Sequence, residues 1–273
     1  MNGLRGTSAF ERLCAAHGRH LPLDEACALV AAEENSETSA EALLAELDSL
    51  AAQVRPRAGA TSFDGVSRLH WLLFTHLGFT GDTESYDHPH NSLLDRVLVR
   101  RRGLPILLCV LYIEVARRVG LEVDAIGWPG HFLVRPVLPG ERLFVDPFNQ
   151  GRVLRAPALR ERLAFVHGAP AGDDRLRLVL SPVDARYVLV RLNNNLKASL
   201  LRRGEVPGAL RAVERMLLLA PELIEERRDR GLMRLHLGQT DTGLEDLRTY
   251  LEARPDAPDR ARVEARLARV KRA

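Results

Sequence analysis

Three residues in the middle of the chain have the types and the order that cysteine-dependent acyl transfer requires. They are Cys109, His131 and Asp146. In that chemistry a thiolate attacks the acyl carbon, an imidazole takes up the proton, and a carboxylate orients the imidazole. A helix N-terminus and a neighbouring imidazolium both lower the thiol pKa and so favour the thiolate. The three side chains therefore raise the hypothesis of a cysteine-type acyl hydrolase or transferase.

An apolar segment predicts the helix that would carry the cysteine. Residues Pro105–Val119 contain only three charged side chains, and Gly120 follows them. Proline is well tolerated in the first turn of a helix, where its missing N–H has no intrahelical partner to lose. A helix that is apolar on almost every side has to be covered by other elements. We expect it to be the core helix of an α+β domain.

Three short runs after this helix predict strands. They are Val123–Trp128, His131–Arg135 and Leu143–Asp146, and Pro-Gly pairs supply the turns between them. His131 starts the second run and Asp146 ends the third. If these two strands are antiparallel neighbours, their ends meet and the imidazole can pair with the carboxylate.

The position of the cysteine argues against a simple nucleophile. Pro105 stands at the mouth of the helix, and Cys109 lies about 6 Å deeper along its axis. Leu108 and Val110 flank the thiol, and a cysteine in such surroundings usually fills space in a core. Without a thiolate, His131 and its carboxylate partner either stabilise strand pairing or help to bind a ligand or peptide in a cleft. A third interpretation is a hydrolase without a covalent step, in which the imidazole activates water.

The first part of the chain is predicted to be helical. Apolar residues recur at three- and four-residue spacing in several segments before the core helix, and in one segment after the strands. These segments are Ser8–His17, Asp24–Glu34, Ala40–Val54, Ser62–Leu77, Asn91–Arg101 and Ala158–Val166. We therefore expect helices, then a small antiparallel sheet, then helices again.

The last third of the chain repeats itself. Turn glycines, apolar residues and a terminal proline coincide at an offset of 34 residues, in the pairs Gly204/Gly238, Ala209/Gly243, Leu210/Leu244, Val213/Leu247, Leu217/Leu251 and Pro221/Pro255. This period and pattern are typical of tetratricopeptide helix–turn–helix units. The sequence predicts two repeats and a last helix, Pro258–Val270. So short an array has to pack on the preceding domain or on a partner.

Long motifs give the chain a family resemblance. The segments SYDHPHNSLLDRVLVRRRGLPILLCVLYIEVARRVGLEVDAIGWPGHFLVRP, FVDPFNQG and VLVRLNNNLK resemble those of the SirB1 family. The resemblance implies a transglutaminase-like (papain-like) α+β domain over residues 1–180 and tetratricopeptide repeats over 181–273. In the wider superfamily the nucleophile stands two residues after a glycine that begins the core helix. Gly103 fills the glycine position, so Pro105 falls on the nucleophile position, while His131 and Asp146 match the other two.

That match implies a degenerate triad. The expected function is a non-catalytic interaction or regulatory protein that holds a protein or peptide segment through its repeats and its inherited cleft. The alternative is a cysteine-dependent acyl hydrolase or transferase that uses Cys109, His131 and Asp146. The residues expected to line the cleft are Tyr86, Asn91, Pro105, Trp128, His131 and Asp146.

Other signals for chemistry are weak. His88 and His90 form an H-x-H pair with His76 upstream, but zinc sites need a third and a fourth ligand that the sequence does not supply nearby. Neither glycine-rich pattern for nucleotide phosphates occurs. We expect no metal and no cofactor.

Composition indicates an ordinary globular protein of the cytoplasm. The 273 residues are 46% hydrophobic and 27% charged, with a formal net charge of +3. The longest uncharged run through the core helix, Leu104–Ile113, is half of what a membrane-spanning helix needs, and no signal peptide is recognisable. Three cysteines suit buried thiols in a reducing compartment. A basic excess in the last fifteen residues is typical of a solvated helix end, so nucleic acid is not an expected partner.

Overall fold

The structure, a computed structural model, describes residues 8–18, 20–54, 61–167 and 172–270. Residue contacts divide the described chain into two compact units. One unit is His17–Val188, and the other joins the described residues of Met1–Ala16 to those of Leu189–Ala273. None of the described helices combines the length and the apolar run needed to cross a bilayer.

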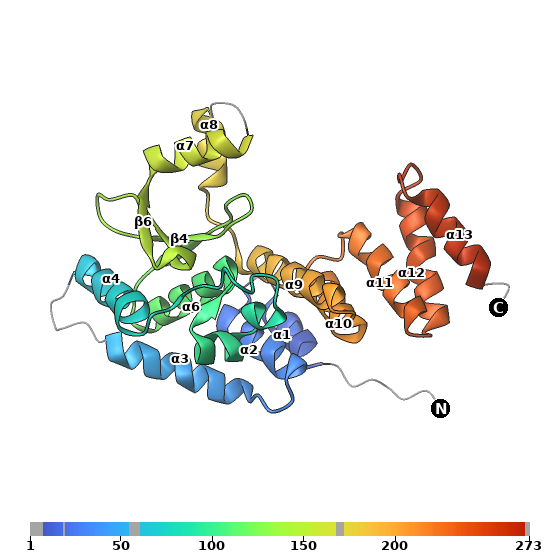
Figure 1. Ribbon diagram of the computed structural model, residues 1–273, viewed down its shortest axis with the longest axis horizontal. Helices are drawn as coiled ribbons and strands as arrows, with labels where there is room; N and C mark the ends of the chain where they lie inside the picture. The colour runs from blue at the N-terminus through green and yellow to red at the C-terminus, as the bar shows by residue number, and fades with distance from the viewer. Residues whose placement is uncertain (1–7, 19, 55–60, 168–171, 271–273) are drawn as a thin grey trace. The chain divides into compact units, whose positions relative to one another are not determined.

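The His17–Val188 unit is an α+β domain, as the sequence predicts (Figure 1). Its helices are α2 (Leu23–Glu34), α3 (Ala40–Val54), α4 (Ser62–His70), α5 (Leu94–Arg100), α6 (Pro105–Arg118), α7 (Ala156–His167) and α8 (Asp173–Val179). Helix α4 continues into a π-helical segment, Trp71–His76, so the single helix expected over residues 62–77 changes its hydrogen-bond pattern part-way.

Helix α6 is the core helix of this domain. It contacts α2 and α3 as well as β3 and β4, and nearly all of its side chains are buried. Pro105 occupies its first turn, and Gly120 has a φ of 77° just beyond its end. That left-handed conformation is accessible to glycine without a Cβ clash, which explains why the helix stops there.

The sheet has four antiparallel strands in the order β3-β4-β5-β6. The strands are β3 (Val123–Ile126), β4 (Leu133–Pro136), β5 (Leu143–Asp146) and β6 (Arg152–Arg155), and a short parallel pair, β1 (Thr80–Gly81) with β2 (Arg102–Gly103), lies outside this sheet. Val134 of β4 pairs with Val145 of β5. That register sets the start of β4 beside the end of β5.

Two strands differ from the expectation. Strand β3 ends at Ile126 and β4 begins only at Leu133. The intervening residues form a turn in which Gly130 has a φ of 68°, so His131 lies just before the strand and not within it. Strand β6 has no counterpart among the predicted strands.

Helices α7 and α8 pack on the sheet through a cluster of buried apolar residues: Ile126, Trp128, Leu133, Phe144, Leu154, Leu159, Leu163, Leu176 and Leu180. Side chains alternate along a strand, and Val134 and Val145, which alternate with this set, are also buried. Both faces of the central strands are therefore covered.

The second unit consists mainly of helical hairpins. Helix α1 (Ala9–His17) falls almost entirely within it, and the repeat helices are α9 (Ala185–Arg202), α10 (Val206–Leu219), α11 (Ile224–His236), α12 (Thr240–Ala253) and α13 (Arg260–Val270). Gly204 and Gly238 both have positive φ, 74° and 75°, in equivalent turns. A Cβ on Gly231 would lie 3.0 Å from the carbonyl oxygen of Gly243. Glycines at both positions therefore let α11 and α12 approach closely.

Candidate functional site

His131 and Asp146 form a hydrogen-bonded pair at the end of the sheet. His131 Nε2 lies 2.8 Å from Asp146 Oδ1. The turn before β4 carries the histidine, and β5 ends at the aspartate. The aspartate is fully buried, whereas the histidine side chain keeps 19% of its surface exposed. The pair therefore consists of a partly exposed imidazole whose position is fixed by a hydrogen bond to a buried carboxylate.

Further donors keep the carboxylate ionised. The side-chain amide of Asn149 donates to Asp146 Oδ2 at 2.8 Å, and its backbone N–H donates to Oδ1 at 3.3 Å. Burial alone would raise the pKa of Asp146, but hydrogen bonds from His131 and Asn149 outweigh it, and the pKa lies below its ordinary value. An ionised carboxylate can only accept hydrogen bonds.

The orientation of the imidazole follows from this charge. Nε2 of His131 has to carry the proton that Asp146 accepts, so in the neutral ring Nδ1 is an acceptor. Among the described residues, no protein group forms a hydrogen bond with Nδ1. One acceptor of the pair is thus open to a ligand.

The two candidate nucleophile positions are both buried. Pro105 lies in the first turn of α6 and has no reactive side-chain group. Cys109 is 1% exposed. Burial, and secondarily the negative charge of Asp146, raise the pKa of the Cys109 thiol well above its ordinary value. The thiol is therefore protonated at neutral pH, and the thiolate is the form that attacks.

A hollow of about 560 Å³ opens beside His131. This volume lies within the usual range for small-ligand sites. Charged, polar, aromatic and aliphatic side chains line it together: Trp128, His131, Asn149, Arg152, Leu154, Ala158, Glu161, Arg162 and Phe165. The last four come from α7 at positions i, i+3, i+4 and i+7, which share one face of a helix.

A ring of Phe148 packs against His131, and a ring of Tyr86 packs against Phe148. The ring of Phe148 meets the His131 ring edge-to-face at 5.7 Å between centroids, and Tyr86 meets Phe148 in the same way at 5.9 Å. Gly81 makes room for Phe148, because a Cβ there would lie 2.4 Å from the phenyl ring. Tyr86, expected to line the cleft, is not among the residues that line the hollow but contacts Phe148, which contacts His131.

Asn91 organises the loop before α5 instead of lining the hollow. Its side chain is fully buried and donates to the carbonyls of Ser85 and Tyr86 at 2.7 and 3.3 Å. Arg100 donates to the Asn91 side-chain oxygen at 2.8 Å and forms an ion pair with the buried Asp82 at 2.5 Å. Of the six residues expected in the cleft, only Trp128 and His131 line the hollow; Asp146 contacts His131 from beneath.

The residues expected in the cleft did not include Phe148, Arg152, Arg162 or Phe165, all of which contact His131 or line the hollow. The motif FVDPF contains Phe148 two residues after Asp146, and this spacing was the available signal. Arg162 and Phe165 lie on a predicted helix, but only the packing of α7 on the sheet brings them to the histidine.

The H-x-H pair is engaged within its own loop. His88 Nδ1 accepts a hydrogen bond from the backbone N–H of His90 at 3.2 Å, and the two rings lie 4.1 Å apart. Across the part of the chain that the structure describes, no three His, Cys, Asp or Glu side chains gather as metal ligands would.

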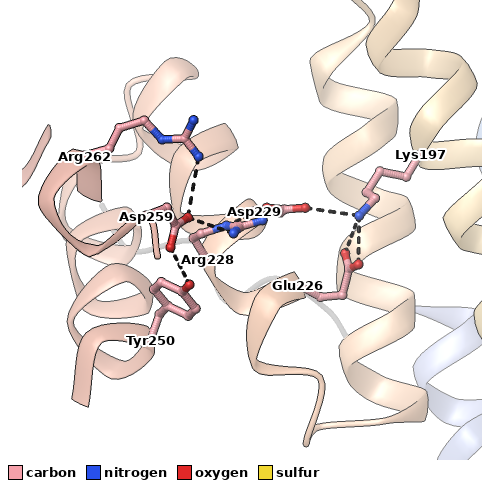
Figure 2. Close-up of polar contacts among 7 residues, drawn as sticks. All are labelled: Lys197, Glu226, Arg228, Asp229, Tyr250, Asp259 and Arg262. Atoms are coloured by element: carbon pink, nitrogen blue, oxygen red, sulfur yellow. Dashed lines mark hydrogen bonds and ion pairs between the residues drawn. The ribbon is translucent and has the colours of Figure 1, made fainter. Parts of the chain in front are cut away.

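The repeat helices carry a separate network of ion pairs (Figure 2). Lys197 of α9 is almost buried, and its ammonium group contacts Glu226 at 2.7 Å and Asp229 at 3.1 Å, both on α11. The network continues through Arg228, Asp259, Tyr250 and Arg262. These contacts tie α9 to α11, and α11 and α12 to the residue before α13.

Sequence comparisons agree with this architecture. The profile of a family described as the transglutaminase-like superfamily matches residues 41–194, and a tetratricopeptide-repeat profile matches residues 196–268. With the UPF0162 proteins and SirB1 as relatives, at the identities given below, the chain belongs to the SirB1 family of transglutaminase-like proteins. The family expected from the sequence motifs is thereby confirmed.

Relatives come from several bacteria. A UPF0162 protein of Xylella fastidiosa (strain Temecula1) is 44% identical over 184 residues, which cover 67% of this chain and 66% of that protein. A UPF0162 protein of Pseudomonas aeruginosa is 32% identical over 204 residues, 73% of this chain and 72% of that one. Protein SirB1 of Salmonella typhimurium is 29% identical over 205 residues, 74% of each chain. The match thus spans just under two-thirds of the Xylella relative.

One solved structure is also similar. It is the crystal structure of menin that reveals the binding site for the Mixed Lineage Leukemia (MLL) protein. The alignment has a TM-score of 0.43 and 10% identity, and covers 87% of this chain and 68% of that one. At that level the likeness supports no inference about function.

Proposed function

We propose that this protein is a non-catalytic interaction or regulatory module, which holds a segment of a partner protein through the hollow beside His131 and through its repeat helices. The observation that carries the proposal is the lack of a usable nucleophile at the core helix. Pro105 has none to offer, and Cys109 is 1% exposed with a raised pKa. A protonated, buried thiol cannot form the acyl intermediate that the alternative needs.

The retained part of the site supports binding. An imidazole with an open acceptor faces a hollow of about 560 Å³ that mixes arginine and aromatic side chains. Such a mixture of apolar walls with a few convergent polar groups is typical of ligand sites. Tetratricopeptide repeats generally mediate contacts between proteins, which gives the second unit the same role.

One observation favours the cysteine-dependent alternative. The His131–Asp146 contact of 2.8 Å is the arrangement that would orient a general base. The same geometry would serve a hydrolase in which His131 activates water directly. Both alternatives require His131 to take part in turnover, and the interaction proposal does not.

Alkylation and turnover together test the proposal. Native protein is treated with iodoacetamide at neutral pH, and each cysteine is followed by peptide mass spectrometry. We expect Cys14, which is partly exposed, to react before Cys27 and Cys109, which are buried. Denatured protein, in which all three react, is the control for peptide recovery. Fast labelling of Cys109 that His131→Ala slows would overturn the proposal.

The turnover assay tests for catalysis that does not need a thiolate. Hydrolysis of p-nitrophenyl acetate and of a peptide thioester is compared between the wild-type chain and His131→Ala. We expect equal, background rates, because the imidazole has no reacting group to serve. A rate that falls in the variant would assign chemistry to His131 and contradict the interaction proposal.

We also propose a cytoplasmic setting and a protein partner in preference to nucleic acid. Three cysteines without a disulfide among them suit a reducing compartment. Asp229 and Asp259 both pair with Arg228, so this guanidinium is already neutralised and is less able to bind the phosphates of a nucleic acid.

A further inference from the structure

Two arginines supply hydrogen-bond donors to the hollow, Arg162 from α7 and Arg152 from β6. Arg162 approaches Asp146 Oδ2 at 3.7 Å, but that oxygen already accepts from Asn149, and the Arg162 side chain is 41% exposed. Arg152 of β6 is exposed and has no ion pair within the described residues. Glu161 is the single acidic side chain among the lining residues. The lining therefore offers two guanidinium groups, each with five N–H donors, to an acceptor-rich ligand.

The wall of the hollow formed by α7 is apolar one turn away from Arg162. Phe165 is 90% exposed, an unusual state for a phenylalanine, and it lines the hollow together with Leu154 and Trp128. Covering a phenyl ring with another apolar group removes both from water and stabilises the complex. The ligand is thus expected to carry an anionic group and a large apolar group.

The spacing of these two features restricts the ligand further. Arg162 and Phe165 are three residues apart on α7, so their Cβ atoms are about 5–6 Å apart. In an extended peptide, adjacent side chains point to opposite sides, so an acidic residue next to an apolar one cannot present both groups to one wall. The last residue of a chain differs, because its carboxylate and its side chain are attached to the same Cα.

We propose that the hollow beside His131 binds the free C-terminus of a partner polypeptide that ends in a large apolar residue. This inference rests on the proposed function and specifies its ligand. Arg162 and Arg152 bind the terminal carboxylate, and Phe165 packs against the last side chain. Nδ1 of His131, the open acceptor of the pair, takes the backbone N–H of that last residue.

Short synthetic peptides test the proposal on the full-length chain. The probes are N-acetyl-Gly-Ser-Gly-Phe and its leucine analogue with a free carboxylate, the same peptides as C-terminal amides, and N-acetyl-Gly-Asp-Phe amide with an internal acid. Binding is followed by calorimetry and by the NMR signals of the His131 ring, up to millimolar peptide. We expect the free acids to bind about tenfold or more tightly than the amides, because charge-assisted hydrogen bonds are lost in the amides.

Variants locate the site. Arg162→Gln and Arg152→Gln are each expected to weaken the free acid about tenfold while leaving the weak amide binding unchanged. Arg160→Gln is the matched control, because Arg160 lies on the same helix, pairs with Asp173 and does not line the hollow. Phe165→Ala should weaken both forms by a similar factor, whereas Val153→Ala, which removes an exposed side chain of β6 outside the hollow, should weaken neither.

The outcomes separate this inference from the function on which it rests. Equal binding of acid and amide, preference for the internal acid, or no binding of any probe would overturn the C-terminus proposal and leave a non-catalytic protein intact. Cleavage of a probe, or its covalent attachment to Cys109, would instead overturn the proposed function. Loss of binding in Arg160→Gln as large as in Arg162→Gln would also contradict the proposal, because the effect would then not belong to the hollow.

Discussion

The α+β domain and the repeat helices each contain a network of buried polar groups, but the two networks are completed differently. In the repeats, the buried charges Lys197 and Asp246 each pair with side chains of a different helix. Lys197 Nζ contacts two carboxylates of α11, and the hydroxyl of Tyr250 donates to Asp259 at 2.6 Å (Figure 2). Burial with full pairing is what a structural cross-link needs. This network holds successive helices in register.

The network in the α+β domain has an open position. Asp146 accepts hydrogen bonds from His131 and Asn149, yet Nδ1 of His131 has no hydrogen-bond partner in the described structure, and His131 lines the hollow. Phe165 adds an apolar side chain that the described residues leave 90% exposed. The comparison separates polar groups that are paired within the fold, Asp146 among them, from Nδ1 of His131, which is left open to a ligand. Variants of the two networks should therefore differ in their unfolding free energy and not only in ligand binding.

The largest effect on stability is expected from Asp146→Ala. The substitution leaves His131 and Asn149 without their common acceptor in a fully buried position, and removing one member of a buried pair costs about 3 kcal/mol of unfolding free energy. Urea unfolding followed by tryptophan fluorescence measures it. The control is Asp124→Ala, which removes a partly exposed partner of Arg135 and should cost less than about 1 kcal/mol. Equal losses would mean that the pair with His131 has no special structural role.

The pH dependence of this difference has a definite sign. The pKa of Asp146 is lower in the folded protein than its ordinary value, so the folded state binds protons less readily than the unfolded chain. Its contribution to stability is complete above the unfolded pKa, which is about 3.9, and decreases as the pH falls through the lower folded pKa. We expect the gap between wild type and Asp146→Ala to narrow below about pH 4 and to stay constant from there to neutral pH.

A smaller loss is expected from Lys197→Met in the repeats. Lys197 and Glu226 keep 10% and 14% of their side-chain surface exposed, so the orphaned carboxylates regain some water. We expect a loss of about 2 kcal/mol. A double-mutant cycle with Glu226→Gln should give a coupling of about 1 kcal/mol. Arg254→Met, from an exposed pair with Glu225, should lose less than about 0.5 kcal/mol. Additive losses at Lys197 and Glu226 would mean that the two side chains are not coupled, and that their contact does not cross-link α9 to α11.

The features that sequence predicted were those fixed locally. Pro105 and Gly120 mark the ends of the core helix because each residue acts through its own backbone, and the repeat turns at Gly204 and Gly238 share one φ for the same reason. The α+β class and the repeat array are confirmed. The Asp146 end of β5 was also placed correctly, since a short apolar run followed by a turn is a local signal.

The features that sequence missed depend on tertiary packing. Residues Arg152–Arg155 alternate too briefly to predict β6, which forms because β5 offers it an edge. The hollow needs α7 to pack on the sheet, and nothing in residues 156–167 alone says which of its faces meets His131. Trp71–His76 changes to a π-helix for a reason that the local sequence does not provide.

The smallest effects on stability are expected from the two side chains of α7 that line the hollow, Arg162 and Phe165. Arg162→Gln alters a partly exposed side chain of α7 and Phe165→Ala an exposed one, and each should change the unfolding free energy by less than about 0.5 kcal/mol. Leu163 lies between them on the same helix and is fully buried, so Leu163→Ala should cost about 3 kcal/mol. Urea unfolding of the three variants measures the contrast. A loss at Phe165 close to that at Leu163 would mean that the phenyl ring supports the fold. If the contrast holds, one face of α7 builds the core, and the other is free to meet a ligand.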